Sequence, residues 1–173
     1  MAELVGVNLD VRNEGTGVAA AISRHAAKEP GSPLGSPLLI VGPVEEGSIV
    51  HPRVFHVASS PRRRREALAA APAGARAVDW HPDLARYGAE QLNRRFEERF
   101  DLPMTEDAWR GWMAVKIAAE AALCHPEADL AQVLPTMRFD GHKGAALRFG
   151  PEDHHLDQPV YLAGPDGKLL PGD

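Results

Sequence analysis

The residues best suited to chemistry lie together near the carboxyl end of the chain. The stretch EDHHLD, from Glu152 to Asp157, holds the adjacent histidines His154 and His155 among three carboxylates. Imidazole and carboxylate groups ligate metals and transfer protons, so a metal-dependent enzyme is one interpretation. However, adjacent residues of an extended chain point to opposite faces, and no H-x-H or H-x-x-x-H spacing aligns two imidazoles. We therefore interpret the stretch as a structural turn into a strand and predict no metal site.

Other catalytic patterns do not occur in the 173 residues. There is no G-x-S-x-G nucleophile turn and no glycine-rich phosphate loop, and no nucleophile, base and orienting group form a recognisable set. The one cysteine, Cys124, excludes an internal disulfide framework and any multi-cysteine metal site. At the end of an apolar helix we expect its thiol to be buried and inert. The sequence thus predicts no catalytic residue, no cofactor and no enzymatic activity.

The most pronounced charge feature is the run of four arginines, Arg62–Arg65, in SSPRRRREAL. Ser60 is a favourable N-cap and Pro61 suits the first helical position. Consecutive helical residues fan around the axis, so these arginines cannot all bind one small anion. Two interpretations stay open: a solvated helix start partly compensated by Glu66, or a helix N-terminus that receives an acidic group from a ligand or partner. The residues of that binding site are Ser59, Ser60, Arg62, Arg63 and Arg64.

Two more strand ends carry candidate binding residues. LLIVG is a short continuous apolar run, typical of a strand buried on both faces. The loop after it places Pro43, Glu45 and Glu46 at the carboxyl end of that strand, where α/β sheets bind ligands. Two carboxylates there would repel the carboxylate of an amino acid. Trp80 and His81 occupy the end of a later strand, ARAVDW, and complete the candidate set.

The elements that must position these residues alternate between strands and helices. Alternating or continuous apolar patterns predict strands at residues 3–11, 38–42, 53–58 and 75–80, with two more in AALRF and PVYLA. Helical patterns cover residues 16–29, 59–71, 81–100 and 105–124, and a short helix runs from Pro126 to about Leu134. This order favours one three-layer α/β domain, residues 1–173, with a mainly parallel sheet. Residues 1–72 form its first part, residues 73–137 a strand and the closing helices, and residues 138–173 the terminal strands.

Composition narrows the possible partners. The net charge is −5, so the chain has no overall basic field and we expect no nucleic acid as a partner. No apolar run approaches the roughly 20 residues that span a bilayer, so we expect no membrane insertion. The amino-terminal residues have no basic start and no apolar core, unlike a secretory signal, which favours the cytoplasm.

Four segments, in this order, resemble type I periplasmic solute-binding proteins, the branched-chain amino acid receptors of ABC importers. They are ELVGVNLDVRNEGTGVAAAI, LLIVGPVEEGSIV, RVFHVASSPRRRREALA, and the closing helices with the terminal hairpin from YGAEQL to the GKLL segment. Within the last part, W-H-P, G-x-x-Q-L and D-H-x-L-x-Q-P are similar to the branch associated with quinoprotein alcohol dehydrogenase systems. The resemblance implies an α/β lobe and a periplasmic location, so the compartment stays open.

The resemblance also implies that about one lobe is present. A full receptor encloses its ligand between two lobes, whereas this chain passes almost directly from the arginine-bearing helix to ARAVDW, where the family places most of its second lobe. We therefore expect a non-catalytic interaction module whose exposed face is covered by another protein or by a second copy. The alternative is a truncated solute-binding protein of an ABC transporter that binds a small organic ligand.

The charges predict how the face would be covered. The acidic loop at Glu45 and Glu46 is expected to lie beside the arginines, and such a mixed surface can pair acid to base about a two-fold axis. Reversing the charge at Arg63 and Arg64 should then disrupt assembly, and the same change at Arg94 and Arg95 should matter less.

Overall fold

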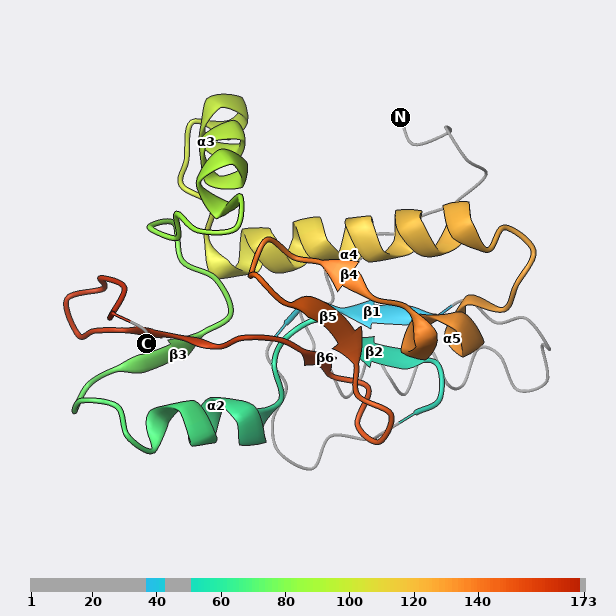
Figure 1. Ribbon diagram of the computed structural model, residues 1–173, viewed down its shortest axis with the longest axis horizontal. Coiled ribbons are helices and arrows are strands. Elements are labelled where there is room, and N and C mark those ends of the chain that lie inside the picture. The colour runs from blue at the N-terminus through green and yellow to red at the C-terminus, as the bar shows by residue number, and fades with distance from the viewer. Residues whose placement is uncertain (1–36, 43–50, 172–173) are drawn as a thin grey trace.

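The computed structural model of the protein describes residues 37–42 and 51–171 (Figure 1). The predicted strand at 3–11, the predicted helix at 16–29 and the loop with Pro43, Glu45 and Glu46 lie outside the described residues. The described strands are β1 (Leu38–Ile40), β2 (Val54–His56), β3 (Arg76–Val78), β4 (Phe139–Asp140), β5 (Ala146–Phe149), β6 (Leu156–Asp157) and β7 (Tyr161–Ala163). The described helices are α2 (Pro61–Leu68), α3 (Ala89–Phe100), α4 (Glu106–Cys124) and α5 (Leu130–Val133), with a 3-10 turn, η1 (Leu134–Thr136).

The fold is a mixture of α and β elements, as predicted, but its strands pair differently. Only β1 and β2 pair in parallel among the described strands, whereas β3–β7, β4–β5 and β5–β6 are antiparallel. The prediction of a mainly parallel sheet is therefore not what these residues form. The reason is local: β4, β5 and β6 follow one another through short turns, and a short turn can join only antiparallel neighbours.

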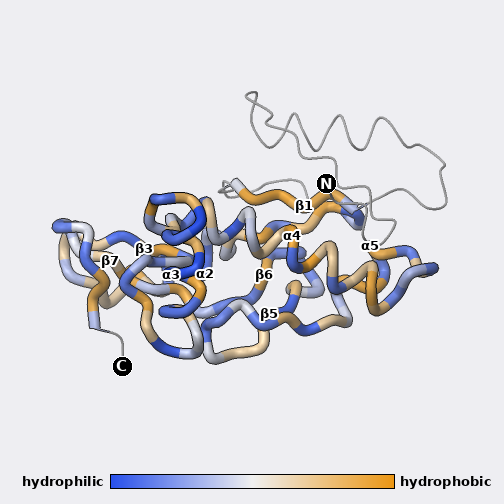
Figure 2. The backbone as a smooth tube through the Cα atoms, turned by 90° about the horizontal axis from the view of Figure 1, so that it is seen from above, coloured by the Kyte–Doolittle hydropathy of each residue, from blue (hydrophilic) through white to orange (hydrophobic). Residues whose placement is uncertain are grey.

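The two sheets that contain β2 and β6 meet at one point. An isolated parallel bridge pairs His56 with His155, and the His56 backbone N–H donates to the His154 carbonyl at 2.9 Å. β2 also pairs with β1, whose apolar run is drawn in orange in Figure 2. The histidine segment thus connects the parallel pair to the terminal meander.

Helix α4 supplies the largest share of the core and extends along the strands (Figure 1). Thr105 caps it, because its hydroxyl accepts the Ala108 backbone N–H at 3.2 Å. Trp109, Met113 and Ile117 follow a helical period and are fully buried, as expected for one face of an amphipathic helix. No helix in the described part of the chain is long and apolar enough to cross a membrane.

Helix α2 begins where the sequence predicts. The Ser60 hydroxyl accepts the Arg63 backbone N–H at 3.3 Å, and Pro61 is the first helical residue. None of the helical residues is buried, so α2 presents its arginines to solvent or to neighbouring polar groups rather than to an apolar core. Position and capping were therefore predictable, whereas the partners of each arginine depend on tertiary structure.

The helix predicted from His81 begins eight residues later, at Ala89. Tyr87 and Gly88 have positive φ angles of 57° and 82°, a conformation that ends any continuous helix. The Asn93 side chain also donates to the Pro82 and Leu84 carbonyls at 2.7 and 3.1 Å and holds this segment as a loop. The apolar pattern that predicted this helix therefore begins before the helix does and does not mark its first residue.

Two smaller expectations are also corrected. The short helix after Pro126 starts at Leu130, because Asp129 caps it by accepting the Ala131 backbone N–H at 3.1 Å. Arg53 fixes that carboxylate with two hydrogen bonds of 2.9 and 2.7 Å. Cys124, expected to be buried, is exposed, because the last turn of α4 rotates it away from the core.

Candidate functional site

The predicted binding residues that the structure describes separate into three places. Ser60, Arg62 and Arg63 line an open groove. Ser59 and Trp80 are buried, with 3% and 1% exposure, and Arg64, with its side chain 23% exposed, reaches inward to Asp79, so none of these three lines the groove. His81 contacts the carboxyl-terminal turn, and its Nε2 lies 2.8 Å from the Gly167 carbonyl oxygen.

The groove lies between the start of α2 and the β5–β6 hairpin and has a volume of about 360 Å³. One side is formed by Ser60, Arg62, Arg63 and Glu66. The other is formed by Arg148 of β5, by the turn at residues 150–155 and by the first strand residues after it. In Figure 1 the chain runs from β2 into α2. The amino-terminal end of α2 is the end nearer to the β5–β6 hairpin.

Within the described part of the chain, the ion pairs that Arg62 and Arg63 form in the groove are exposed. Arg62 Nε contacts Glu66 Oε1 at 2.9 Å with its side chain 81% exposed, and Arg63 contacts Asp157 at 3.0 Å with 50% exposure. Pairs of this kind contribute only about 0–1 kcal/mol because water screens them. Arg148 stands directly across from Asp157 in the β5–β6 ladder and forms no ion pair with a described residue. These guanidinium groups can therefore exchange their partners for an incoming group at little cost.

The connection between β5 and β6 adds acidic side chains to the groove lining. The turn between β5 and β6 carries Glu152 and Asp153, and two backbone bonds between Gly150 and the histidine segment close it. Asp153 Oδ1 accepts the His155 backbone N–H at 3.1 Å, which leaves its second oxygen for the groove. Basic and acidic side chains therefore line the same groove, and Glu152 and Asp153 come from the turn rather than from α2 or the strands.

The paired histidines have the geometry of a structural clamp. His154 Nδ1 lies 3.1 Å from the Val54 carbonyl oxygen, and His155 Nδ1 lies 3.0 Å from that of Ala58. A carbonyl oxygen only accepts, so each Nδ1 carries the proton. The two rings stack on Phe55 and His56, with centroid distances of 4.7 and 4.5 Å. Among the described residues no three histidine, cysteine or acidic side chains are placed to hold a metal ion.

Beneath the groove lies a buried charge network centred on Asp79, whose side chain is fully buried. Its carboxylate accepts the Ser59 hydroxyl and backbone N–H, and it pairs with Arg64 and Arg110 at 3.0 Å each. Glu106 bonds both arginines and accepts the Asp79 backbone N–H at 2.7 Å. Burial raises the pKa of Asp79, but Lys143, Arg64 and the Ser59 bond outweigh it and hold the pKa below its usual value.

Lys143 completes the interior with only 3% exposure. Its Nζ donates to Gln158 Oε1 at 2.6 Å and to the Pro159 carbonyl at 3.2 Å, and it lies 4.1 Å from the Trp109 ring centroid. Burial lowers its pKa to about 7, although Asp79 and other carboxylate charges oppose the shift. This lysine fixes the segment after β6 against α4.

The lowered pKa makes stability depend on pH in a defined direction. Between pH 7 and the ordinary lysine pKa of 10.5, the unfolded chain carries the proton at Lys143 and the folded chain does not. Stability therefore rises with pH in this window, by about 1.4 kcal/mol per unit. We expect wild type to gain about 2 kcal/mol between pH 7 and 9 relative to Lys143→Met in urea unfolding, less than two full units' worth because the group is half protonated near pH 7. Lys168→Met changes an exposed lysine, and its free energy of unfolding should depend on pH as that of wild type does. If the free energies of wild type and Lys143→Met change with pH in parallel, the pKa of Lys143 is not lowered.

The buried network has no open position for a substrate. Asp79, Arg110 and Lys143 are all 3% exposed or less; Asp79 and Arg110 bond each other, and Lys143 donates to Gln158 and to the Pro159 carbonyl. The network connects α2, β3, α4 and the terminal strands, and so sets the position of the groove above it. Sequence reasoning missed these residues. The burial of Arg110 could have been predicted from its position in the helix. It lies one residue after Trp109 and three before Met113, on the buried face of α4.

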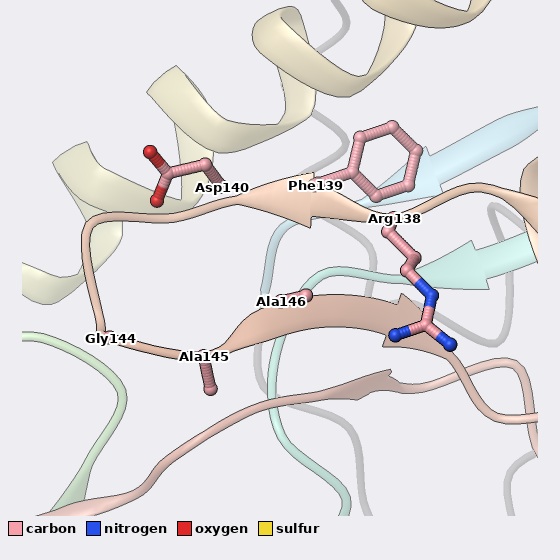
Figure 3. Close-up of a pocket in the computed structure, with 6 residues that line it drawn as sticks. All are labelled: Arg138, Phe139, Asp140, Gly144, Ala145 and Ala146. Carbon is pink, nitrogen blue, oxygen red and sulfur yellow. The ribbon is translucent and has the colours of Figure 1, made fainter.

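A second hollow, of about 270 Å³, lies at the β4–β5 turn (Figure 3). Its lining residues are Arg138, Phe139, Asp140, Gly144, Ala145 and Ala146. Figure 3 shows the guanidinium of Arg138 and the carboxylate of Asp140 directed away from each other. Because its polar groups do not converge, this hollow has less of the character of a binding site than the groove beside α2.

Comparison with known proteins adds no family: no protein-family model and no curated protein matches the chain. The functional assignment therefore rests on the chemistry of the groove and of the network beneath it.

Proposed function

We propose that this chain is a non-catalytic interaction module that docks a partner protein, or a second copy of itself, through the groove between α2 and the β5–β6 hairpin. The proposal rests on the ion pairs that the guanidinium groups of Arg62, Arg63 and Arg148 form or lack. Two are held by exposed ion pairs, and the third forms none with a described residue. Solvent-facing charges of this kind steer encounter and select partners.

The fold of the module, in this proposal, derives from one three-layer lobe of the type I solute-binding proteins that the sequence resembles. Absence of catalysis is part of the proposal. It is supported by the burial of Asp79 and Lys143, two groups with a shifted pKa, which are bonded inside the protein and do not line the groove. Catalytic acids and bases need access to the substrate proton.

Charge reversal in the groove tests the proposal. Arg62→Glu with Arg63→Glu should weaken association at least about tenfold, the equivalent of about 1.4 kcal/mol. Raising the salt concentration should weaken association of the wild type in the same direction. The matched control is Arg94→Glu with Arg95→Glu on the exposed face of α3. Arg64, part of the original expectation, is unsuitable for this test because it supports Asp79 in the interior.

The measurement is light scattering with chemical cross-linking, across a range of salt concentrations and at micromolar protein. If wild type and both double variants give the same mass at every salt concentration, and retain the same proteins from an extract, the groove does not dock anything. If the α3 control weakens association as much as the groove variant, the docking surface lies elsewhere.

The alternative is a receptor for a small organic ligand, and one observation favours it. The groove volume of about 360 Å³ falls within the range of small-molecule sites, roughly 300–1,000 Å³. In that case the chain is a monomer whose melting temperature rises with small mono-, di- or tricarboxylates, and the rise depends on Arg62 and Arg63.

A further inference from the structure

Two groups of charged side chains line the groove and form its two poles. The basic wall consists of Arg62, Arg63 and Arg148 on α2 and β5, and the acidic turn consists of Glu152 and Asp153 between β5 and β6. The wall also holds Glu66 and Asp157, but each of these already neutralises one arginine. Counted over the described residues, the wall therefore keeps Arg148 without an ion-pair partner, and the turn keeps its acidic charge.

This distribution restricts what can occupy the groove. A uniformly acidic partner, such as a nucleic acid, would be attracted by the wall but repelled by the turn. A uniformly basic partner would be attracted by the turn but repelled by the wall. A fitting partner must carry both signs, at the spacing of the two poles.

A second copy of the chain meets that requirement by construction. In a two-fold interface the same patch faces itself, so a contact from the wall of one copy to the turn of the other is made twice. We propose, resting on the docking function above, that the groove pairs with the groove of a second copy, basic wall against acidic turn.

A pair of charge-reversed variants tests self-pairing directly. The wall variant, Arg62→Glu with Arg148→Glu, makes both poles acidic. The turn variant, Glu152→Lys with Asp153→Lys, makes both poles basic. None of these four positions belongs to the buried network, so both variants should fold, which circular dichroism and thermal unfolding verify.

The expected result is reciprocal. Each variant alone should show an apparent dimer Kd at least tenfold weaker than wild type in sedimentation velocity, because like poles face each other. An equimolar mixture should form a heterodimer with an affinity near that of wild type, because each acidic pole then meets a basic one. High salt should dissociate the wild-type dimer and the mixed dimer alike.

Other outcomes overturn the inference in distinguishable ways. Variants that self-associate like wild type, or a mixture that stays monomeric where wild type dimerises, exclude pairing through the two poles. Wild type that is monomeric at tens of micromolar in low salt excludes self-pairing and leaves docking to a different protein, which the Arg62 and Arg63 test decides separately.

Discussion

Replacing Asp79 by asparagine should remove about 3–5 kcal/mol from the free energy of unfolding, the cost of breaking a buried ion pair on one side. The carboxylate is fully buried and pairs with Arg64 and Arg110, whose side chain is only 2% exposed. Asparagine keeps the shape but removes the charge, so a buried guanidinium loses its main counter-ion. Glu106 remains as a neighbour and limits the loss.

Urea unfolding at pH 7 measures this loss, with Asp83→Asn as the matched control. Asp83 has a side chain that is 63% exposed and contacts only His81 among the charged residues described, so its replacement should change stability by less than about 0.5 kcal/mol. A loss of under about 1 kcal/mol for Asp79→Asn would show that water or a rearrangement satisfies the arginines. The network would then not be the element that fixes α2 against α4.

The parts of the fold that follow from short-range rules were predictable. Ser60 and Thr105 cap their helices because a hydroxyl beside the first helical turn satisfies a free N–H, and both are visible in the sequence. The burial of Trp109 and Met113 follows from helical period alone. The pairing direction of the strands was wrongly predicted because it depends on connections, and the five residues between β4 and β5 force a hairpin.

The candidate site could be predicted only in part, for a similar reason. The arginine run indicated a charged surface, and Ser60, Arg62 and Arg63 do line the groove. Nothing local distinguishes Arg64 from its neighbours, because the groups that draw it inward, Asp79 and Glu106, stand 15 and 42 residues away. The opposite wall comes from a hairpin at the other end of the chain. Its contribution appears only once β5 and β6 are placed.

The second large effect that we expect is a loss of stability at low pH, caused by His56. One ring nitrogen of this buried histidine has no hydrogen-bond partner among the described residues. This nitrogen is Nδ1, and the residue is 3% exposed. Burial lowers its pKa from 6.5 to about 4, and the stacked His155 and nearby His154 act in the same direction, with Asp153 opposing. The ring is therefore neutral in the folded protein at pH 5, where the unfolded chain is charged.

The direction of the pH effect follows from these protonation states. Between pH 6.5 and about 4 the unfolded chain binds more protons, so the stability present above pH 6.5 is lost as the pH falls through this window. At about 1.4 kcal/mol per unit the full loss is about 3 kcal/mol. His56→Phe keeps a ring against His155 but cannot be protonated, and it should lose less stability than wild type by that amount. Carboxylates that titrate in both proteins cancel in the difference.

Urea unfolding of both proteins from pH 7.5 to 4 measures this difference. His125→Gln provides the control, since this exposed residue after α4 should leave the acid dependence of wild type unchanged. A difference between wild type and His56→Phe that stays constant with pH would mean that His56 becomes charged in the folded state. Because the His155 segment clamps β2 and forms the floor of the acidic turn, the same protonation would then also alter the groove.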